Sequence, residues 1–388
     1  MTNIKYYRDL LAQPDRIEAF RRAIAAVVRP GDKVLDVGTA LGTFAFFAAD
    51  ARAAEVWAVD GDPVIHVARL IGQLNGYEDR VRFVRGWLPE VPIPGRADVV
   101  VFEDFPPQLM GGSVFRLLRS VQQRCAAPGA RMVPAQADFF LAPVSSDSLR
   151  SEVTPLGEED QAFGIDWSPT REYVVNSPLN VGIPPEALAA PASRVASLRF
   201  DAAPDADALQ GSASWTLEQE AELHGLAYWF DMDLGGGERL SNAPGAEPGS
   251  WGHLFLPVDP PLRARDGDTV HATIRVDAHA DGVPCWLAWE LAVGEERRRG
   301  HEFQAAPASL ADLAMRSPDS VPRLAPAGEL EASVLALTDG KRSIRDIARE
   351  IVALRDGLSQ AEAERLVAGT LQHKIVIERG IESSGGSQ

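Results

Sequence analysis

The residues that point most directly to chemistry lie between positions 33 and 44, which read KVLDVGTALGTF. The apolar run at 34–37 predicts a strand that is buried on both faces. Gly38 and Gly42 follow it, and Phe44 begins a predicted apolar helix. Small residues between a strand and a helix let the backbone approach a ligand, and the first turn of a helix offers free N–H groups. The stretch therefore predicts a cofactor site.

The next predicted strand, residues 55–60, narrows the choice of cofactor. It ends in Asp60, about 20 positions past the turn, where a carboxylate can bind ribose hydroxyls. Asp36 within the first strand, and Ala40 in place of a third glycine, favour S-adenosylmethionine over NAD. No Gly-Lys-Ser/Thr follows the turn, which excludes a phosphate-binding P-loop. NAD binding and a purely structural turn remain the alternatives.

The composition is that of a globular protein with room for two or three domains. Of its 388 residues, 45% are hydrophobic and 24% are charged. No apolar run has the length of a membrane span, and the first residues lack the core of a signal peptide. Cys125 and Cys285 are too few for a disulfide framework or a zinc site. These features predict a cytoplasmic protein without a metal centre.

The formal charge of −17 is concentrated in the middle of the chain. Residues 145–250 carry 18 Asp and Glu, five Arg and no Lys. Such a surface repels nucleic acid, which is bound through dense Lys and Arg contacts. It could attract a basic substrate or peptide, or it could serve only as a solubilising face.

Strands and helices alternate in the first part of the chain, which predicts a Rossmann-like α/β domain at residues 1–136. The strand expected at 98–102 delivers Glu103 and Asp104 at its carboxyl end, where ligands of open α/β sheets bind. The other expected strands are 34–37, 55–60, 81–84 and 130–133, and the expected helices are 6–28 (broken at Pro14), 64–75 and 114–125.

After Pro134 the alternation stops, and short β-type runs predict an antiparallel β-barrel at residues 137–304 for substrate binding and dimerisation. The runs are 139–142, 195–200, 212–216, 227–232, 253–257, 270–276 and 285–291. Tyr228, Trp229 and Phe230 are expected in the barrel core, and 242–250 is expected to be an exposed loop.

A third, smaller unit is predicted beyond an Ala/Pro/Ser-rich linker at residues 305–325. Helical patterns at 329–337, 343–354 and 360–372, with a strand at 374–378, predict a winged-helix-like domain over 326–382. Ser343 and Ser359 are placed as helix N-caps, and 383–388 is a predicted disordered tail.

From residue 6 to residue 291 the chain resembles the protein arginine methyltransferases, which carry a class I cofactor domain followed by a β-barrel. The resemblance rests on the motifs above, on Arg16 in the first helical segment and on the stretches 86–90, 163–166, 251–255 and 261–268. It implies that Arg16 binds the methionine carboxylate of the cofactor and that Trp87 and Leu88 meet the adenine. The cofactor-binding residues implied in this way are Arg16, Asp36, Gly38, Thr39, Gly42, Asp60, Gly61, Trp87, Leu88 and Glu103.

The chain departs from this family at the acceptor site. Arginine methyltransferases hold the substrate guanidinium between two glutamates, of which Glu103 matches the first and Gly112 replaces the second. The family's histidine is Ser250 here, and its paired aspartate is Gln13. A guanidinium is a planar fork that wants two carboxylates, so its binding would lose several kcal/mol.

These residues predict a methyltransferase that converts S-adenosylmethionine to S-adenosylhomocysteine while methylating N or O of a biosynthetic peptide or a small natural-product intermediate. Glu103 and His253 are the candidate catalytic groups, and Asp104, Trp251 and His253 are the candidate acceptor-binding groups. An arginine N-methyltransferase with an altered site is the alternative. A cofactor-binding regulatory or scaffold protein without catalysis is the alternative from another class.

Two further expectations concern partners. Residues 335–347 resemble part of the small peptide-binding chaperone of pyrroloquinoline quinone biosynthesis, which implies a peptide partner for the C-terminal unit. A role in packing or dimerisation is the plainer interpretation of that unit. The resemblance to arginine methyltransferases implies a homodimer through an arm on the barrel, for which residues 152–163 are the candidate.

Overall fold

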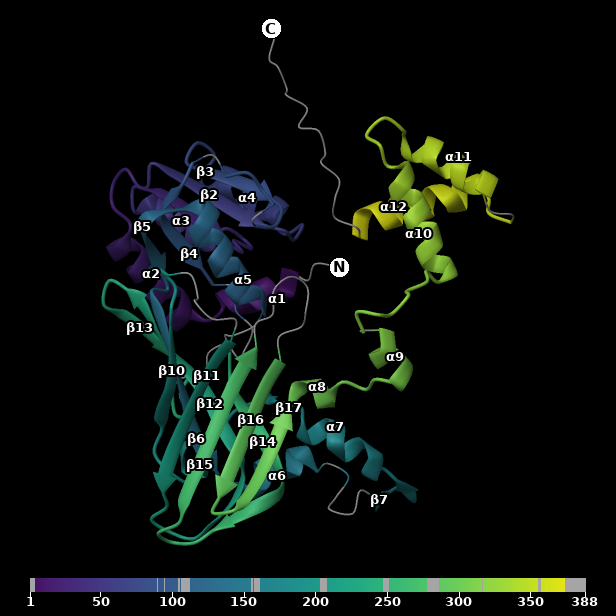
Figure 1. Ribbon diagram of the computed structural model, residues 1–388. Helices are drawn as coiled ribbons and strands as arrows, with labels where there is room; N and C mark the ends of the chain where they lie inside the picture. The colour runs from purple at the N-terminus through teal and green to yellow at the C-terminus, as the bar shows by residue number, and fades with distance from the viewer. Residues whose placement is uncertain are drawn as a thin grey trace. The chain divides into compact units, whose positions relative to one another are not determined.

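The computed structural model divides the chain into two units, Met1–Pro307 and Ala308–Gln388 (Figure 1). It describes residues 4–88, 90–93, 95–103, 105, 112–154, 156, 161–202, 208–246, 251–277, 286–315, 317–354 and 357–373. Among the described residues, no helix has the length and apolar character needed to cross a membrane.

The first unit begins with a parallel five-stranded sheet in the order β3-β2-β1-β4-β5. Its strands are β1 (Lys33–Val37), β2 (Glu55–Asp60), β3 (Val81–Arg85), β4 (Ala97–Phe102) and β5 (Ala126–Val133). Its helices are α1 (Ile4–Leu11), α2 (Pro14–Val27), α3 (Thr43–Asp50), α4 (Ile65–Leu74) and α5 (Gly112–Ser120), followed by the π-helical turn Val121–Cys125. The predicted Rossmann-like sheet is therefore confirmed.

The strand order reverses between β1 and β4, and this reversal sets the place of a ligand. In such sheets the connections leave β1 and β4 toward opposite faces, which opens a crevice at their carboxyl ends. The glycine-rich turn follows β1, and Glu103 follows β4. Pro14 sits in the first turn of α2, where its missing N–H costs no hydrogen bond, so the predicted break between two helices is also confirmed.

Antiparallel strands follow and form two sheets, β10-β6-β12-β14-β9 with β13 paired to β12, and β11-β15-β16-β17. All seven predicted runs lie in these strands, although residue 200 follows the end of β10 and Cys285 lies outside the described part of the chain. Their bounds are Gln136–Val144 (β6), Leu179–Val181 (β9), Ser193–Arg199 (β10), Ala208–Thr216 (β11), Ala221–Gly235 (β12), Glu238–Ser241 (β13), His253–Ala264 (β14), Thr269–Asp277 (β15), Trp286–Val293 (β16) and Glu296–His301 (β17).

The core of this barrel-like part is built around β12, the longest strand. Tyr228, Trp229 and Phe230 are buried in it, as predicted. Figure 1 shows the long strands running from the parallel sheet toward the far end of the unit. The connections contain α6 (Asp147–Val153), α7 (Arg171–Val175), α8 (Glu302–Ala305), single turns of 3-10 helix at Ser168–Thr170 and Pro185–Ala187, and a small hairpin of β7 (Gln161–Ala162) and β8 (Ile165–Asp166).

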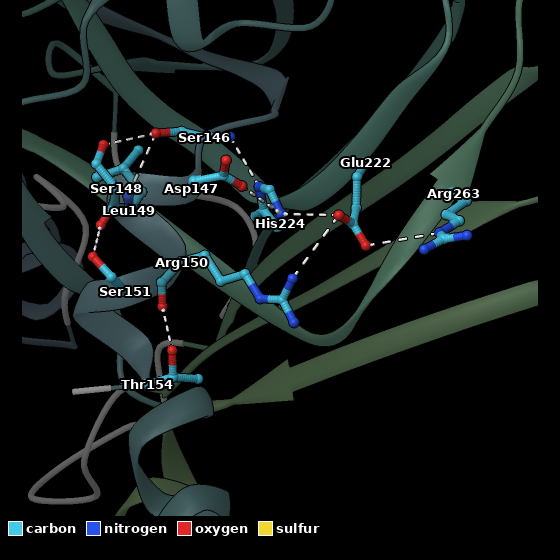
Figure 2. A network of polar contacts seen from close by, with 10 residues as sticks. All are labelled: Ser146, Asp147, Ser148, Leu149, Arg150, Ser151, Thr154, Glu222, His224 and Arg263. Carbon is cyan, nitrogen blue, oxygen red and sulfur yellow. Dashed lines mark hydrogen bonds and ion pairs between the residues drawn. The ribbon is translucent and has the colours of Figure 1, made fainter. Parts of the chain in front are cut away.

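A polar network attaches α6 to the strands (Figure 2). The backbone N–H of Ser146 donates to Nδ1 of buried His224 at 2.9 Å, and the Ser146 hydroxyl caps the first turn of α6. Glu222, two residues before His224 on β12, lies 3.9 Å from Arg150 of α6 and 3.8 Å from Arg263 of β14. This network fixes the start of the segment that leads to the β7–β8 hairpin.

The second unit contains α9 (Leu310–Met315) within the predicted linker, and then α10 (Pro326–Leu337), α11 (Ile344–Leu354) and α12 (Gln360–His373). The last three helices share a core of their own around Val334, Ile347, Ile351 and Val367. The predicted helix caps are confirmed, because the hydroxyls of Ser343 and Ser359 accept from the amides of Asp346 and Glu362. The predicted strand 374–378 lies outside the described residues, so the winged-helix assignment stays a prediction.

Candidate active site

The turn between β1 and α3 has the backbone form that small residues allow. Gly38, Ala40 and Gly42 have φ angles of 72°, 48° and 87°, in the left-handed region that glycine tolerates best. The amides of Gly38 and Thr39 donate to the carbonyl of Val59 at 2.9 and 3.1 Å. The turn is therefore held against the neighbouring strand β2, and Gly42 caps α3 at the crevice.

Asp60 at the carboxyl end of β2 faces the same turn. Its Oδ2 accepts from the amide of Ala40 at 2.8 Å, and its Oδ1 accepts from the amide of Asp62 at 2.7 Å. These two backbone amides hold the carboxylate in a fixed orientation beside the turn. The structure thus brings Asp60 and the glycine-rich turn together, as the sequence predicts for a ribose ligand.

Asp36 is the buried carboxyl of the site, with 1% of its surface exposed. Burial raises its pKa to about 7, and the nearby Asp60 and Glu103 carboxylates add to the rise. Hydrogen bonds from the Thr39 hydroxyl, at 2.5 Å, and from the Ala45 backbone oppose it. The carboxyl therefore changes its charge close to neutral pH.

Trp87 lies directly over Gly61, next to the end of β2. A Cβ atom on Gly61 would stand 2.1 Å from the indole ring, so only glycine permits this contact. The Trp87 side chain is 54% exposed, while Leu88 packs against the core. An aromatic face beside the carboxylate of Asp60 suits the base of a nucleoside.

Arg16 of α2 and Glu103 at the end of β4 form a direct ion pair through Nη1 and Oε1. Only 5% of the Arg16 side chain and 15% of the Glu103 side chain are exposed. Nη2 of Arg16 donates to the carbonyl of Leu10 at 3.2 Å, and its buried Nε has no hydrogen-bond partner among the described residues. Both residues were predicted for this site, but their pairing was not.

Trp251 brings the antiparallel part of the chain into the site. Its ring centroid lies 5.7 Å from the Cζ atom of Arg16, within the range of a cation–π contact. The ring is 7% exposed and stands edge-on to Phe230, with centroids 5.6 Å apart. Trp251 was predicted to bind the acceptor. In the structure its ring contacts Arg16, which was predicted to bind the cofactor.

His253 is half-buried on β14, and its Nδ1 accepts from the amide of Ile183 at 2.8 Å. Burial lowers its pKa, and hydrogen bonds with the backbone of Ala243 and Asn242 partly offset this effect. A histidine held in this way links β14 to the neighbouring connection, and its catalytic role stays a prediction. Asp104 and Ser250 lie outside the described residues.

Asn242 and Asn180 were missed by sequence reasoning, which placed Asn242 in an exposed loop. Asn242 is instead buried, with 4% exposed, and its side chain accepts from the amide of Phe230 at 2.9 Å and donates to the carbonyl of Gly252. An asparagine after a β-hairpin is typical of an exposed turn, so its type gave no sign of a buried bridge.

A protein-family model described as "Arginine methyltransferase oligomerization subdomain" matches residues 135–284. Protein arginine N-methyltransferase 6 of Xenopus laevis is 25% identical over 285 residues, covering 70% of this chain and 84% of that protein. The probable histone-arginine methyltransferase CARM1 of Oryza sativa subsp. indica is 26% identical over 328 residues, covering 79% and 62%.

Two of the solved structures that match this chain cover about three quarters of it. The Trypanosoma brucei PRMT1 enzyme–prozyme heterotetrameric complex with AdoHcy has a TM-score of 0.71 at 20% identity, covering 77% of this chain and 98% of that one. Arabidopsis thaliana protein arginine methyltransferase 10 has a TM-score of 0.65 at 19% identity, with the same coverage. The chain has the protein arginine methyltransferase fold.

This protein arginine methyltransferase fold accounts for the parallel sheet and the barrel-like strands, as predicted. The predictions of a methyltransferase and of S-adenosylmethionine as its cofactor are also confirmed by these relatives. The likeness of the C-terminal unit to a peptide chaperone, the nature of the acceptor and the individual site roles stay predictions.

Proposed function

We propose that this chain transfers the methyl group of S-adenosylmethionine to nitrogen or oxygen of an acceptor other than an ordinary protein arginine, either a biosynthetic peptide or a small natural-product intermediate. The observation that carries the proposal is the Arg16–Glu103 ion pair at the end of β4, near Asp36 of β1. The pair joins Arg16, the predicted ligand of the cofactor's methionine carboxylate, to Glu103. Glu103 is the one that remains of the two glutamates with which arginine methyltransferases hold the acceptor.

The donor set fits the cofactor. The turn of Gly38 and Gly42 gives close backbone approach, and Asp60 offers oriented acceptors to the ribose hydroxyls. Gly61 leaves space for the Trp87 ring, which provides an aromatic face. The buried guanidinium of Arg16, with its Nε lacking a hydrogen-bond partner among the described residues, suits the methionine carboxylate.

The charge at Glu103 argues against an ordinary arginine acceptor. Its carboxylate already pairs with Arg16, and the position of the second glutamate of arginine methyltransferases is Gly112, which has no carboxylate. An acceptor guanidinium would meet one shared carboxylate in a largely buried place, where an incompletely paired charge is costly. A neutral or weakly basic nitrogen or a hydroxyl avoids that cost.

The bound cofactor supplies an electrophilic methyl group on a sulfonium. The acceptor lone pair forms the new bond to carbon while the C–S bond breaks and its electrons stay on sulfur. Arg16 orients the amino-acid end of the cofactor, and Glu103 accepts the proton that the acceptor N–H or O–H loses. Trp251, which is 7% exposed, contacts Arg16 from the barrel side.

We also propose that the chain forms a homodimer through the β7–β8 hairpin. Phe163 at the turn of this hairpin is 92% exposed, and Ile165 beside it is 51% exposed. Exposed apolar side chains at the tip of a projecting hairpin suit a protein interface. The matched "oligomerization subdomain" includes this hairpin.

The acceptor is identified by incubating the purified chain with methyl-labelled S-adenosylmethionine and a lysate of the source organism, and locating the label by mass spectrometry. We expect the label on a peptide or small molecule at an atom other than an arginine guanidinium. Label confined to protein arginine residues would contradict the acceptor proposed here.

Glu103→Gln tests the proton acceptor, using the labelled acceptor as substrate. The variant keeps a hydrogen bond to Arg16 but loses the basic charge, so turnover is expected to fall on the order of 100-fold while cofactor affinity changes little. Glu302→Gln is the matched control, because Glu302 is a half-buried carboxyl bonded to the amide of Leu287 in the barrel-like part. Unchanged turnover in Glu103→Gln would remove Glu103 from the chemistry.

A further inference from the structure

We propose that Trp251, held in place by Asn242 and Asn180, is a positioning residue that fixes the guanidinium of Arg16 for the amino-acid end of the cofactor. The inference rests on the function proposed above and deepens it. It makes the barrel-like part a component of the cofactor site, with residues that sequence reasoning did not assign to cofactor binding.

Arg16 is restrained on three sides. Nη1 contacts Glu103, Nη2 contacts the Leu10 carbonyl, and the Trp251 ring lies 5.7 Å from Cζ. A guanidinium is planar, so an aromatic ring against it restricts its rotation as well as its position. The two hydrogen-bonded partners belong to the cofactor domain, whereas Trp251 comes from the segment that precedes β14.

Asn242 fixes the backbone beside Trp251. Its Oδ1 accepts from the amide of Phe230 at 2.9 Å, and its Nδ2 donates to the carbonyl of Gly252. The amide of Asn242 donates back to the Phe230 carbonyl at 3.2 Å. Phe230 also packs against the edge of the Trp251 ring. Buried Asn242 thus joins Phe230 of β12, which packs against the Trp251 ring, to Gly252, the residue after Trp251.

Asn180 of β9 restrains the same segment from the other side. With its amide oriented to satisfy both polar atoms, its nitrogen donates to the carbonyls of Trp251 and His253 at 3.0 and 3.3 Å. Gly252 has a φ of 59°, and a Cβ there would stand 2.2 Å from the Asn180 side chain. The backbone at Trp251 is therefore held by two asparagines and a glycine that no larger residue can replace.

This arrangement makes a specific demand on ligands. Only a ligand with the amino-acid tail engages Arg16, so only such a ligand should lose affinity when Trp251 no longer fixes it. S-adenosylhomocysteine carries the tail, and 5′-methylthioadenosine has the same nucleoside thioether without it. The ratio of the two affinities therefore isolates the contribution of Arg16 from general damage to the site.

The test is calorimetric titration of both compounds into wild-type, Trp251→Leu and Trp251→Phe proteins. Trp251→Leu should weaken S-adenosylhomocysteine by about fivefold to tenfold, the range of a partly buried cation–π contact, with less than about a twofold change for methylthioadenosine. Trp251→Phe keeps an aromatic face and should retain most of the affinity. Equal losses for the two compounds, or no loss for S-adenosylhomocysteine, would overturn the inference.

Asn242→Asp is the second variant, since it keeps the size of the side chain but removes the donor to Gly252. It should produce the same tail-selective loss, whereas Trp289→Phe, in a buried tryptophan bonded to the Pro257 carbonyl, should leave the ratio unchanged. If the wild-type chain binds neither compound, the proposed function fails together with the inference. If it binds both but the ratio does not move in Trp251→Leu or Asn242→Asp, the inference alone fails.

Discussion

Asp36 shows how a single buried carboxyl can make the stability of the protein depend on pH. Its pKa is raised to about 7, chiefly by burial, so the native state holds a proton that an unfolded aspartate releases near pH 4. The stabilising contribution of that proton is present at low pH and is lost as pH rises toward 7. Above this value both states are ionised, and the dependence levels off.

Asp36→Asn should remove this pH dependence, because an amide does not ionise in this range. The amide oxygen can still accept from the Thr39 hydroxyl, so the local hydrogen bond is kept. The difference in unfolding free energy between Asp36→Asn and wild type is expected to grow by about 2 kcal/mol from pH 5 to pH 7 and little beyond. Urea unfolding of the ligand-free proteins at several pH values measures it. A difference that stays constant with pH would show that Asp36 ionises in the native state as it does in the unfolded chain.

For single residues, the sequence predicted those whose surroundings are set by a local motif better than those whose partners lie far away in the chain. Gly38, Gly42 and Asp60 were predictable because a strand–turn–helix motif fixes their neighbours locally. The pairing of Arg16 with Glu103 joins residues far apart in the sequence, and resemblance alone indicated that both belong to one site. Asn242 was unpredictable, because its burial depends on how two strands and a loop meet.

At the scale of elements, α6 depends on one buried histidine. His224 of β12 accepts from the amide of Ser146, the N-cap residue of α6, and the surrounding carboxylates and arginines lie on α6, β12 and β14 (Figure 2). Leucine at this position would leave the half-buried backbone N–H of Ser146 without its acceptor. Such a loss costs about 1–3 kcal/mol.

His224→Leu is therefore expected to lower the unfolding free energy by about 1–3 kcal/mol and to speed hydrogen exchange of the α6 amides. Exchange measured by mass spectrometry on peptides covering Asp147–Val153 reports it. Asp147→Asn is the control, since this side chain is 99% exposed and should change stability by less than about 0.5 kcal/mol. Equal exchange of α6 in His224→Leu and wild type would exclude the anchoring role.

Helices and strands were predicted well where apolar residues recur at the spacing of a helix or a strand. They were predicted poorly where pairing with a neighbouring strand, and not an apolar pattern, defines the strand. β12 was found from its apolar centre, but its ends extend beyond the predicted run, because the strand continues on pairing with β6 and β14. β17 was missed, since ERRRGH has no apolar alternation. It lies at the end of its sheet, where Arg297 and Arg299 both pair with Glu290 of β16.

At the scale of the whole molecule, Met1–Pro307 contains every site residue that the structure describes, and Ala308–Gln388 has a separate helical core. The parallel sheet and the switch to antiparallel strands followed from the sequence pattern, whereas the order of the strands in the sheet was not predicted. The contact of Trp251 with Arg16 did not follow from the pattern, since it depends on how the barrel-like strands meet α2. The residues proposed to act in methyl transfer that the structure describes therefore belong to the first unit.

The central claim is a single S-adenosylmethionine site at the ends of β1 and β2, with Asp60 holding the ribose. Calorimetric titration of S-adenosylmethionine and NADH into wild type, Asp60→Ala and the surface control Asp201→Ala tests it most directly. We predict one site per chain for S-adenosylmethionine, an affinity at least about tenfold lower in Asp60→Ala, as expected for lost hydrogen bonds to a charged group, and an unchanged affinity in Asp201→Ala. Binding of NADH in place of S-adenosylmethionine, or equal affinity of Asp60→Ala and wild type, would contradict the account.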